Sequence, residues 1–130
     1  MHLCYCDSKK NYAACCGLFI DGEKSAKTVK QLMRSRYTAY SKGGCGAYLL
    51  ATWFPATVGN LSAAELDIAQ ANWQRLEVLD SSQSGDEGMV EFKAYFTDAT
   101  HSGEQCMHER SVFSRVKGRW YYVGGEVNSG

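Results

Sequence analysis

The chain has few of the features that mark whole classes of protein. It contains a single proline, Pro55, and no apolar run approaches the roughly 20 residues of a membrane-spanning helix. Lys and Arg balance Asp and Glu at 14 each, and a net charge of zero argues against a general nucleic-acid binder. A phosphate-cradling Gly-rich loop and a His-Glu-x-x-His zinc motif are also missing. Nucleotide-binding and metalloprotease functions are therefore poorly supported.

What the chain does contain indicates one folded domain. Its 130 residues are 45% hydrophobic and 12% aromatic, which is enough to bury one core and excludes disorder. The N-terminus has no basic stretch followed by an apolar run, as an export signal would have. We therefore expect a cytoplasmic protein, and a reducing compartment favours metal binding over disulfides.

Four of the six cysteines lie within the first sixteen residues, as Cys4, Cys6, Cys15 and Cys16. Zn²⁺ takes four thiolates at about 2.3 Å, and the eight-residue loop between the pairs can fold one pair over the other. Disulfides, for which four cysteines allow three pairings, and free thiols are the alternatives. We predict one Zn²⁺ per chain, structural because four thiolates leave no open position for catalysis.

The pattern Cys-x-Cys-x8-Cys-Cys-Gly resembles the SEC-C motif, a small zinc-binding element also found at the C-terminus of the SecA preprotein translocase ATPase. The positions that match it are Cys4, Cys6, Ser8, Lys10, Tyr12, Cys15, Cys16 and Gly17. The chain departs from it with Tyr5 for proline, Asp7 and Lys9 for two glycines, and Asn11 for lysine. The resemblance implies zinc binding and contact with another protein, as the SecA element contacts the SecB chaperone.

Three helices are expected between the cysteines and Trp73. The first begins after Thr28, which can accept a hydrogen bond from the first turn, and ends at 42–44, which reads Lys-Gly-Gly. The second runs from Ala47 to Phe54 and stops before the proline. The third is opened by a Ser-x-x-Glu capping box at 62–65 and continues through Asn72.

After Trp73 the hydrophobic period changes from 3.6 to 2, which predicts strands. A short strand at 76–80 is followed by a loop at 81–88. The later strands are expected at Met89–Thr97, Gln105–Val116 and Arg119–Gly124. Helices followed by a meander of about four antiparallel strands predict an α+β fold, with the helices packed on one face of a curved sheet.

Two further signatures extend the resemblance over nearly the whole chain. They are Leu-Met-Arg-Ser-Arg-Tyr at 32–37 and His-Glu-Arg-Ser-x-Phe at 108–113, the second followed by Gly-x-Trp-Tyr-Tyr at 118–122. Together with the cysteines they resemble the YchJ family of small bacterial proteins. The resemblance implies a zinc element at 1–20 and, at 21–130, a cone-shaped body like nuclear transport factor two (NTF2-like, cystatin-like). It implies no particular activity.

Strand parity suggests a second site in this body. Glu109 shares a face with Phe113, which we expect to lie under the helices, and a buried carboxylate needs a partner. Arg34 and Arg36 on the first helix are the available cations, with Arg36 preferred for an ion pair that ties helix to sheet. The alternative is a pocket in which Glu109 and an arginine grip a small ligand, with Tyr37 or Tyr95 as further wall residues.

The leading functional hypothesis is protein binding through the zinc element, and the alternative is a small-molecule-binding or catalytic pocket in the concavity of the sheet. No catalytic residue is assigned. Lys and Arg exceed Asp and Glu by five in residues 1–60, and the reverse holds in 61–130. This division suits complementary faces within one fold, or a surface that orients a partner. Cys45 and Cys106 are expected to be small buried side chains.

Overall fold

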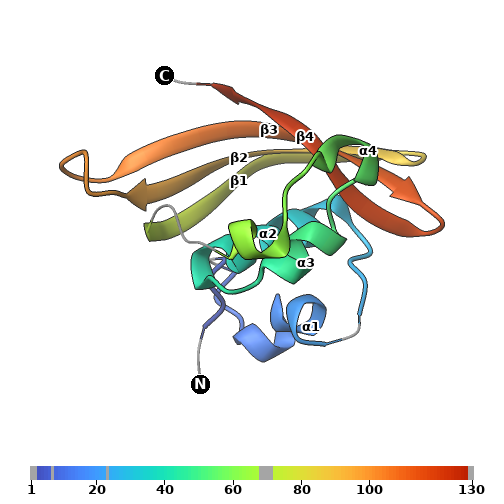
Figure 1. The fold of residues 1–130 in the computed structure, drawn as a ribbon, viewed down its shortest axis with the longest axis horizontal. Helices are drawn as coiled ribbons and strands as arrows, with labels where there is room; N and C mark the ends of the chain where they lie inside the picture. The colour runs from blue at the N-terminus through green and yellow to red at the C-terminus, as the bar shows by residue number, and fades with distance from the viewer. Residues whose placement is uncertain (1–2, 7, 23, 68–71, 129–130) are drawn as a thin grey trace.

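The computed structural model describes residues 3–6, 8–22, 24–67 and 72–128. Its sheet has four strands, each hydrogen-bonded to the next in antiparallel fashion, in the order β1-β2-β3-β4 (Figure 1). Their bounds are β1 Asn72–Ser84, β2 Glu87–Thr97, β3 Gln105–Val116 and β4 Arg119–Asn128. The predicted α+β class and the meander are confirmed.

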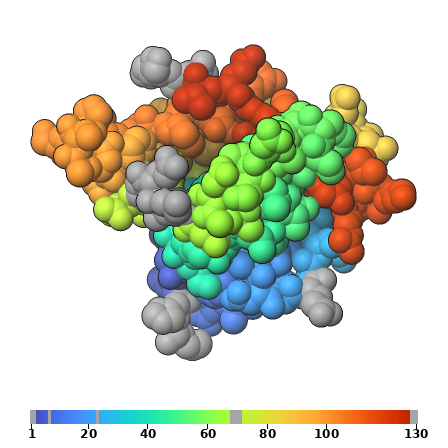
Figure 2. Space-filling model, in the orientation of Figure 1, coloured from blue at the N-terminus to red at the C-terminus, as the bar shows by residue number. Residues whose placement is uncertain are grey.

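The helical segments are η1 Tyr12–Ala14, α1 Gly17–Ile20, α2 Val29–Lys42, α3 Gly46–Ala51, α4 Pro55–Val58 and α5 Ala63–Leu66. The helices α1, α2 and α3 lie on one side of this sheet, and α4 overlaps the strands in this view (Figure 1). The space-filling view shows the N-terminal segment as a layer below the helices, with the strands above them (Figure 2). The helix α2 therefore has neighbours on two opposite sides. Among the described helices, none is long and apolar enough to cross a membrane.

The ends of α2 follow from local sequence. The Thr28 hydroxyl accepts a hydrogen bond from the Gln31 amide at 3.1 Å, and the Gln31 side chain accepts one from the Thr28 amide at 3.3 Å. This capping box satisfies two of the exposed amides of the first turn. The helix ends at Gly43, whose φ of 78° is favourable for glycine because glycine has no Cβ.

Burial on α2 explains why it can serve two layers. Its buried residues include apolar Leu32 and Met33 but also polar Ser35, Arg36 and Thr38. A surface helix buries one stripe only, so burial of polar positions beside the apolar stripe indicates neighbours on more than one face. Toward the sheet, the stripe packs on alternate residues of β2, namely Val90, Phe92 and Ala94, and on Phe113 and Trp120. The predicted parity of β2 and β3 is confirmed.

Several predicted boundaries are wrong. The expected loop at 81–88 is a hairpin, because β1 continues to Ser84 and β2 begins at Glu87, with Gly85 at a φ of 60° in the turn. The expected third helix ends as α5 at Leu66, and β1 has begun by Asn72; positions 68–71 lie outside the described residues. The proline that was expected to follow the second helix is itself the first residue of α4. At this position the missing backbone N–H removes no hydrogen bond of the helix.

Candidate functional site

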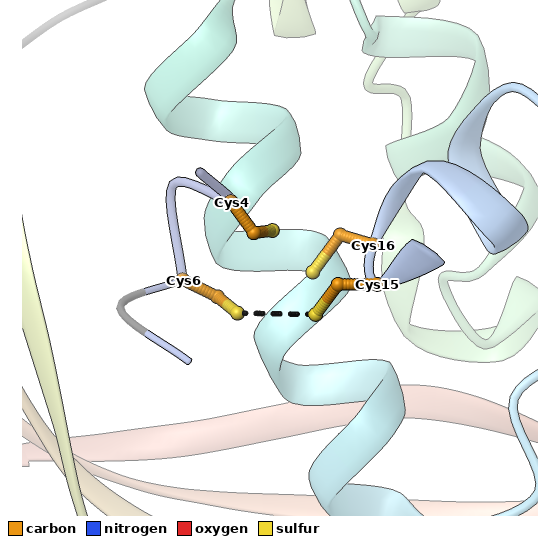
Figure 3. A group of neighbouring side chains, drawn as sticks. All are labelled: Cys4, Cys6, Cys15 and Cys16. Carbon is orange, nitrogen blue, oxygen red and sulfur yellow. Dashed lines mark hydrogen bonds between the residues drawn. The ribbon is translucent and has the colours of Figure 1, made fainter. Parts of the chain in front are cut away.

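The described residues between Leu3 and Cys16 form a loop that brings both cysteine pairs together. Leu3 and Asn11 form an antiparallel bridge, and the Cys4 amide donates to the Lys10 carbonyl at 2.7 Å. This closes the loop and returns the chain to η1, after which Cys15 and Cys16 lead into α1. The four sulfur atoms point toward one another beside α2 (Figure 3).

The donor set fits a tetrahedral metal ion. All four Sγ atoms lie within 4.8 Å of one another, and those of Cys6 and Cys15 are 3.6 Å apart. Four sulfurs at 2.3 Å from one zinc ion would be separated by about 3.8 Å. All six cysteines of the chain are free thiols in this structure. The geometry therefore matches the predicted ligands Cys4, Cys6, Cys15 and Cys16.

Polar groups around the sulfur cluster contact its sulfur atoms and its backbone. The Ser8 hydroxyl lies 3.2 Å from the sulfur of Cys15, and the Thr38 hydroxyl of α2 lies 3.7 Å from that of Cys4. Arg34 donates from Nη1 to the Cys6 carbonyl at 2.7 Å. Four thiolates around Zn²⁺ would carry a net charge of −2. The hydroxyl groups of Ser8 and Thr38 and the cation of Arg34 offset part of this charge.

The thiols influence one another strongly. Hydrogen bonds from Cys16 and Cys4 hold the pKa of the Cys6 thiol far below its usual value. Burial raises the pKa of the Cys15 thiol, and the charge of Cys6 raises it further. The cluster therefore favours the thiolate form at Cys6. Such a site favours a bound metal ion, because the metal replaces the protons of its thiol ligands.

The two arginines of the 32–37 signature face different sites. Arg34 and Thr38 lie four residues apart on the face of α2 that meets the cysteines. Arg36, Tyr37 and Tyr40 lie on the face toward the sheet. Arg34, expected as a pocket or ion-pair residue, therefore belongs to the cysteine site instead. Positions 34 and 36 differ by about 200° around a helix, which places them on opposite sides.

A cavity of about 250 Å³ lies between α2 and the concave face of the sheet. Of the predicted residues, Arg36, Tyr37 and Glu109 line it. Most of the wall is aromatic or apolar, with residues from α2, the segment after α3 and all four strands: Met33, Tyr40, Trp53, Trp73, Phe92, Ala94, Met107, Ser111, Phe113 and Tyr122.

Within the described residues Arg36 forms no salt bridge with a carboxylate, so the expected direct ion pair with Glu109 is wrong. Only 5% of Arg36 is exposed, and its Nη1 donates to the Leu49 carbonyl at 2.7 Å and the Thr52 hydroxyl at 2.6 Å. Its guanidinium lies 5.0 Å from the centroid of the Trp53 ring and 4.6 Å from that of Tyr122. Burial lowers the pKa of Arg36, and the charge of Glu109 is among the groups that oppose this decrease. The ring faces of Trp53 and Tyr122 stabilise the charge of the guanidinium.

Glu109 is held by hydroxyl groups of the sheet. Its Oε2 accepts hydrogen bonds from Ser111 and, at 3.4 Å, from Tyr122. Burial raises the pKa of Tyr122, and the charge of Glu109 adds to the increase. Gly125 makes room for the carboxylate, because a Cβ there would lie 2.6 Å from Oε2. The tie between helix and sheet is therefore indirect and passes through Tyr122, which contacts both Arg36 and Glu109.

Tyr95 is not part of the cavity. It lies on the opposite face of the sheet, where the Arg75 guanidinium is 3.7 Å from its ring centroid and its hydroxyl donates to Glu77 at 3.4 Å. Its position in β2 excludes Tyr95 from the cavity. Successive side chains of a strand point to opposite faces, and Phe92 and Ala94 of this strand point into the core.

Two wall residues that the sequence analysis did not assign are Trp53 and Tyr122. They form a parallel bridge, with the Tyr122 amide donating to the Thr52 carbonyl at 2.8 Å. The indole nitrogen of Trp53 is buried and has no acceptor within the described residues. Tyr122 belongs to the Gly-x-Trp-Tyr-Tyr signature, which was the available signal for this residue, but nothing in the local sequence indicates that it meets Trp53.

The remaining candidates stand apart from both sites. Cys45 is buried, as expected, whereas Cys106 is exposed on β3 and is not a core residue. His101 is exposed between β2 and β3 and contacts Asp98. His2 lies outside the described residues.

Comparison with known proteins identifies the family. The family described as "YchJ, middle NTF2-like domain" matches residues 28–125. The UPF0225 protein of Serratia proteamaculans is 39% identical over 128 residues, covering 95% of this chain and 82% of that protein. A UPF0225 protein of Sodalis glossinidius is 40% identical over 126 residues, covering 94% and 81%.

Solved structures agree in fold. The solution structure of a SEC-C motif containing protein from Rhodopseudomonas palustris has a TM-score of 0.87 at 35% identity, covering 98% of this chain and 100% of that one. The crystal structure of a SEC-C motif containing protein from Psychrobacter arcticus has a TM-score of 0.82 at 27% identity, covering 100% and 85%. The chain belongs to the YchJ family, with an NTF2-like domain behind the cysteine cluster of a SEC-C motif.

Proposed function

We propose that this chain is a zinc-binding protein whose cysteine element presents a binding surface to another protein. The observation that carries the proposal is the convergence of four sulfur atoms within 4.8 Å at the N-terminal segment. When bound, zinc supplies a structural cross-link between the two cysteine pairs. Four thiolate ligands leave no position for a water or a substrate, so the site holds the segment in shape and performs no reaction.

The surface of this element suits an acidic partner with an apolar anchor. Leu3 is 64% exposed, and Tyr5 is 43% exposed with its ring packed edge-on against Tyr12. Lys9 and Lys10 are exposed beside them. Exposed apolar side chains next to cations are typical of an interface in which one partner supplies carboxylates and apolar contacts.

Metal content is the first test. Protein purified under reducing conditions without chelator should carry one zinc ion per chain in native mass spectrometry. Cys106→Ser is the matched control, because this exposed cysteine lies outside the cluster and its loss should leave the zinc content at one. Well under one equivalent of zinc in the unmodified chain would contradict the proposal.

Partner binding is tested separately with paired variants. The double variant Leu3→Ser with Lys10→Glu should retain zinc and lose a protein that the unmodified chain captures from a bacterial extract. The control, Val127→Ser with Lys30→Glu, replaces one exposed aliphatic residue and one exposed lysine outside the element and should keep that protein. The captured protein should then bind the purified chain directly. Equal capture by both double variants would rule out the cysteine element as the interface.

A further inference from the structure

The cavity between α2 and the sheet has the size of a small-molecule site. An engineered apolar cavity of about 150 Å³ holds benzene, so about 250 Å³ accommodates about ten non-hydrogen atoms, or one bicyclic ring. Aromatic rings dominate the wall, including those of Trp73, Phe92 and Tyr122. A flat, mostly apolar molecule would gain the most from contact with such a wall.

The charges of the wall set the charge of the molecule. Arg36 contributes one positive charge and Glu109 one negative charge to the same cavity. A ligand with a net charge would leave the filled cavity charged in apolar surroundings, which is costly. A neutral ligand keeps the balance between the two side chains.

Glu109 also has unused bonding capacity. Both hydrogen bonds to its carboxylate, from Ser111 and Tyr122, are made at Oε2. Oε1 accepts none from the described part of the chain. A carboxylate oxygen in this position is a strong acceptor for an N–H or O–H group of a ligand. The donor at Arg36 is by contrast engaged with the Leu49 carbonyl and the Thr52 hydroxyl.

We infer that this cavity binds a neutral bicyclic aromatic molecule with one hydrogen-bond donor, which it gives to Oε1 of Glu109. The aromatic wall favours a flat ring system, and the opposite charges of Arg36 and Glu109 favour a ligand without net charge. The carboxylate oxygen Oε1 favours a ligand with an N–H or O–H donor. This binding site is separate from the cysteine element, and its occupation requires no partner protein.

The test uses the full zinc-loaded chain and three probes: indole, 1-methylindole and indole-3-carboxylate. Ligand-observed NMR titrations should show that indole binds about tenfold more tightly than 1-methylindole, since a hydrogen bond to a charged acceptor is worth about one order of magnitude or more. The carboxylate should bind more weakly than indole. Tighter binding of the carboxylate, equal binding of the two neutral probes, or no binding up to about 1 mM would each overturn the inference.

Variants locate the site. Glu109→Gln should weaken indole about tenfold and leave 1-methylindole within twofold. Glu91→Gln is the matched control, because Glu91 lies one position away in the sheet register, contacts His108 and lines no part of the cavity. If Glu109→Gln fails to fold, Gly125→Ala replaces it, since its Cβ must displace the Glu109 carboxylate. Unchanged indole binding in whichever variant folds would overturn the inference.

Discussion

On one side of α2, Arg34 and Thr38 meet a cluster of thiols, whereas on the other side Arg36 and Tyr37 line a cavity. The cysteine cluster is built almost entirely by residues 4–16, and one backbone bridge closes it. The cavity draws on α2, the segment after α3 and all four strands. The two sites differ in what holds them together: the proposed metal ion in the first, and the packing of the domain core in the second.

This difference predicts that the sites fail separately. Cys4, Cys6 and Cys16 are buried against the same apolar cluster as Val29 and Leu32, so the cysteine layer adds to the core. Nevertheless, Phe92, Phe113 and Trp120 pack between sheet and α2 without contribution from the metal. Loss of zinc should therefore loosen one layer, and loss of a cavity residue should weaken the whole domain.

The largest effect is expected from Cys16→Ser. Structural zinc in a four-ligand site contributes about 10–16 kcal/mol of binding free energy, so removal of one buried ligand should abolish tight zinc binding. Amide hydrogen exchange should become fast in residues 3–20 and stay slow in β2 and β3. If β2 and β3 lose protection as well, the division into a zinc element and an independent body is wrong.

The next effect is expected from Arg36→Ala, at about 2–4 kcal/mol of unfolding free energy. The substitution removes two hydrogen bonds from a charged donor and the contacts with the Trp53 and Tyr122 rings. Chemical denaturation measures the loss, and zinc content should stay at one. A loss below about 0.5 kcal/mol would show that this buried cation does not stabilise the domain.

Arg34→Ala is the matched change on the opposite face of the helix. Arg34 supports the Cys6 carbonyl, and removal of an outer-shell partner of a metal site typically weakens binding about 10–100-fold. Competition with a chromophoric chelator measures the zinc affinity. Indole binding in the cavity should not change. Equal effects of the two arginine variants on zinc affinity would contradict the separation of the faces.

The smallest effect is expected from Lys9→Gly. Lys9 has a φ of 67°, in the region that costs a residue with a Cβ about 1–2 kcal/mol. Glycine removes that strain, so the zinc-loaded segment should become more stable by about 1 kcal/mol. Lys10→Gly is the control, because its φ is not positive and glycine there only adds chain entropy. Stabilisation by both variants, or by neither, would contradict this explanation.

The same contrast explains how much could be predicted from sequence. Local signals were reliable: the cysteine spacing, the helix cap at Thr28, and the period-2 alternation that includes Val90, Phe92 and Ala94 all predicted what the structure contains. Lys9, which stands where the SEC-C motif has a glycine, has a positive φ. Each of these depends on a few residues close together in the chain.

Predictions that needed distant contacts were less successful. The expected third helix reaches Asn72, whereas Asn72 and Trp73 belong to β1. The ring of Trp73 packs 5.2 Å from that of Phe96 and 5.9 Å from that of Tyr37 between centroids. The predicted pairing of Arg36 with Glu109 overlooked Trp53 and Tyr122, whose rings lie against the guanidinium. No local pattern encodes the bridge that brings these two aromatics together, because it joins segments about 70 residues apart.

The most direct test of the central claim is X-ray absorption spectroscopy at the zinc edge of the purified, reduced chain. The four-cysteine site predicts a single shell of four sulfur atoms at about 2.3 Å from the zinc ion. A shell with nitrogen or oxygen at about 2.0–2.2 Å in place of one or more sulfurs would contradict it, because at least one of Cys4, Cys6, Cys15 and Cys16 would then not be a ligand.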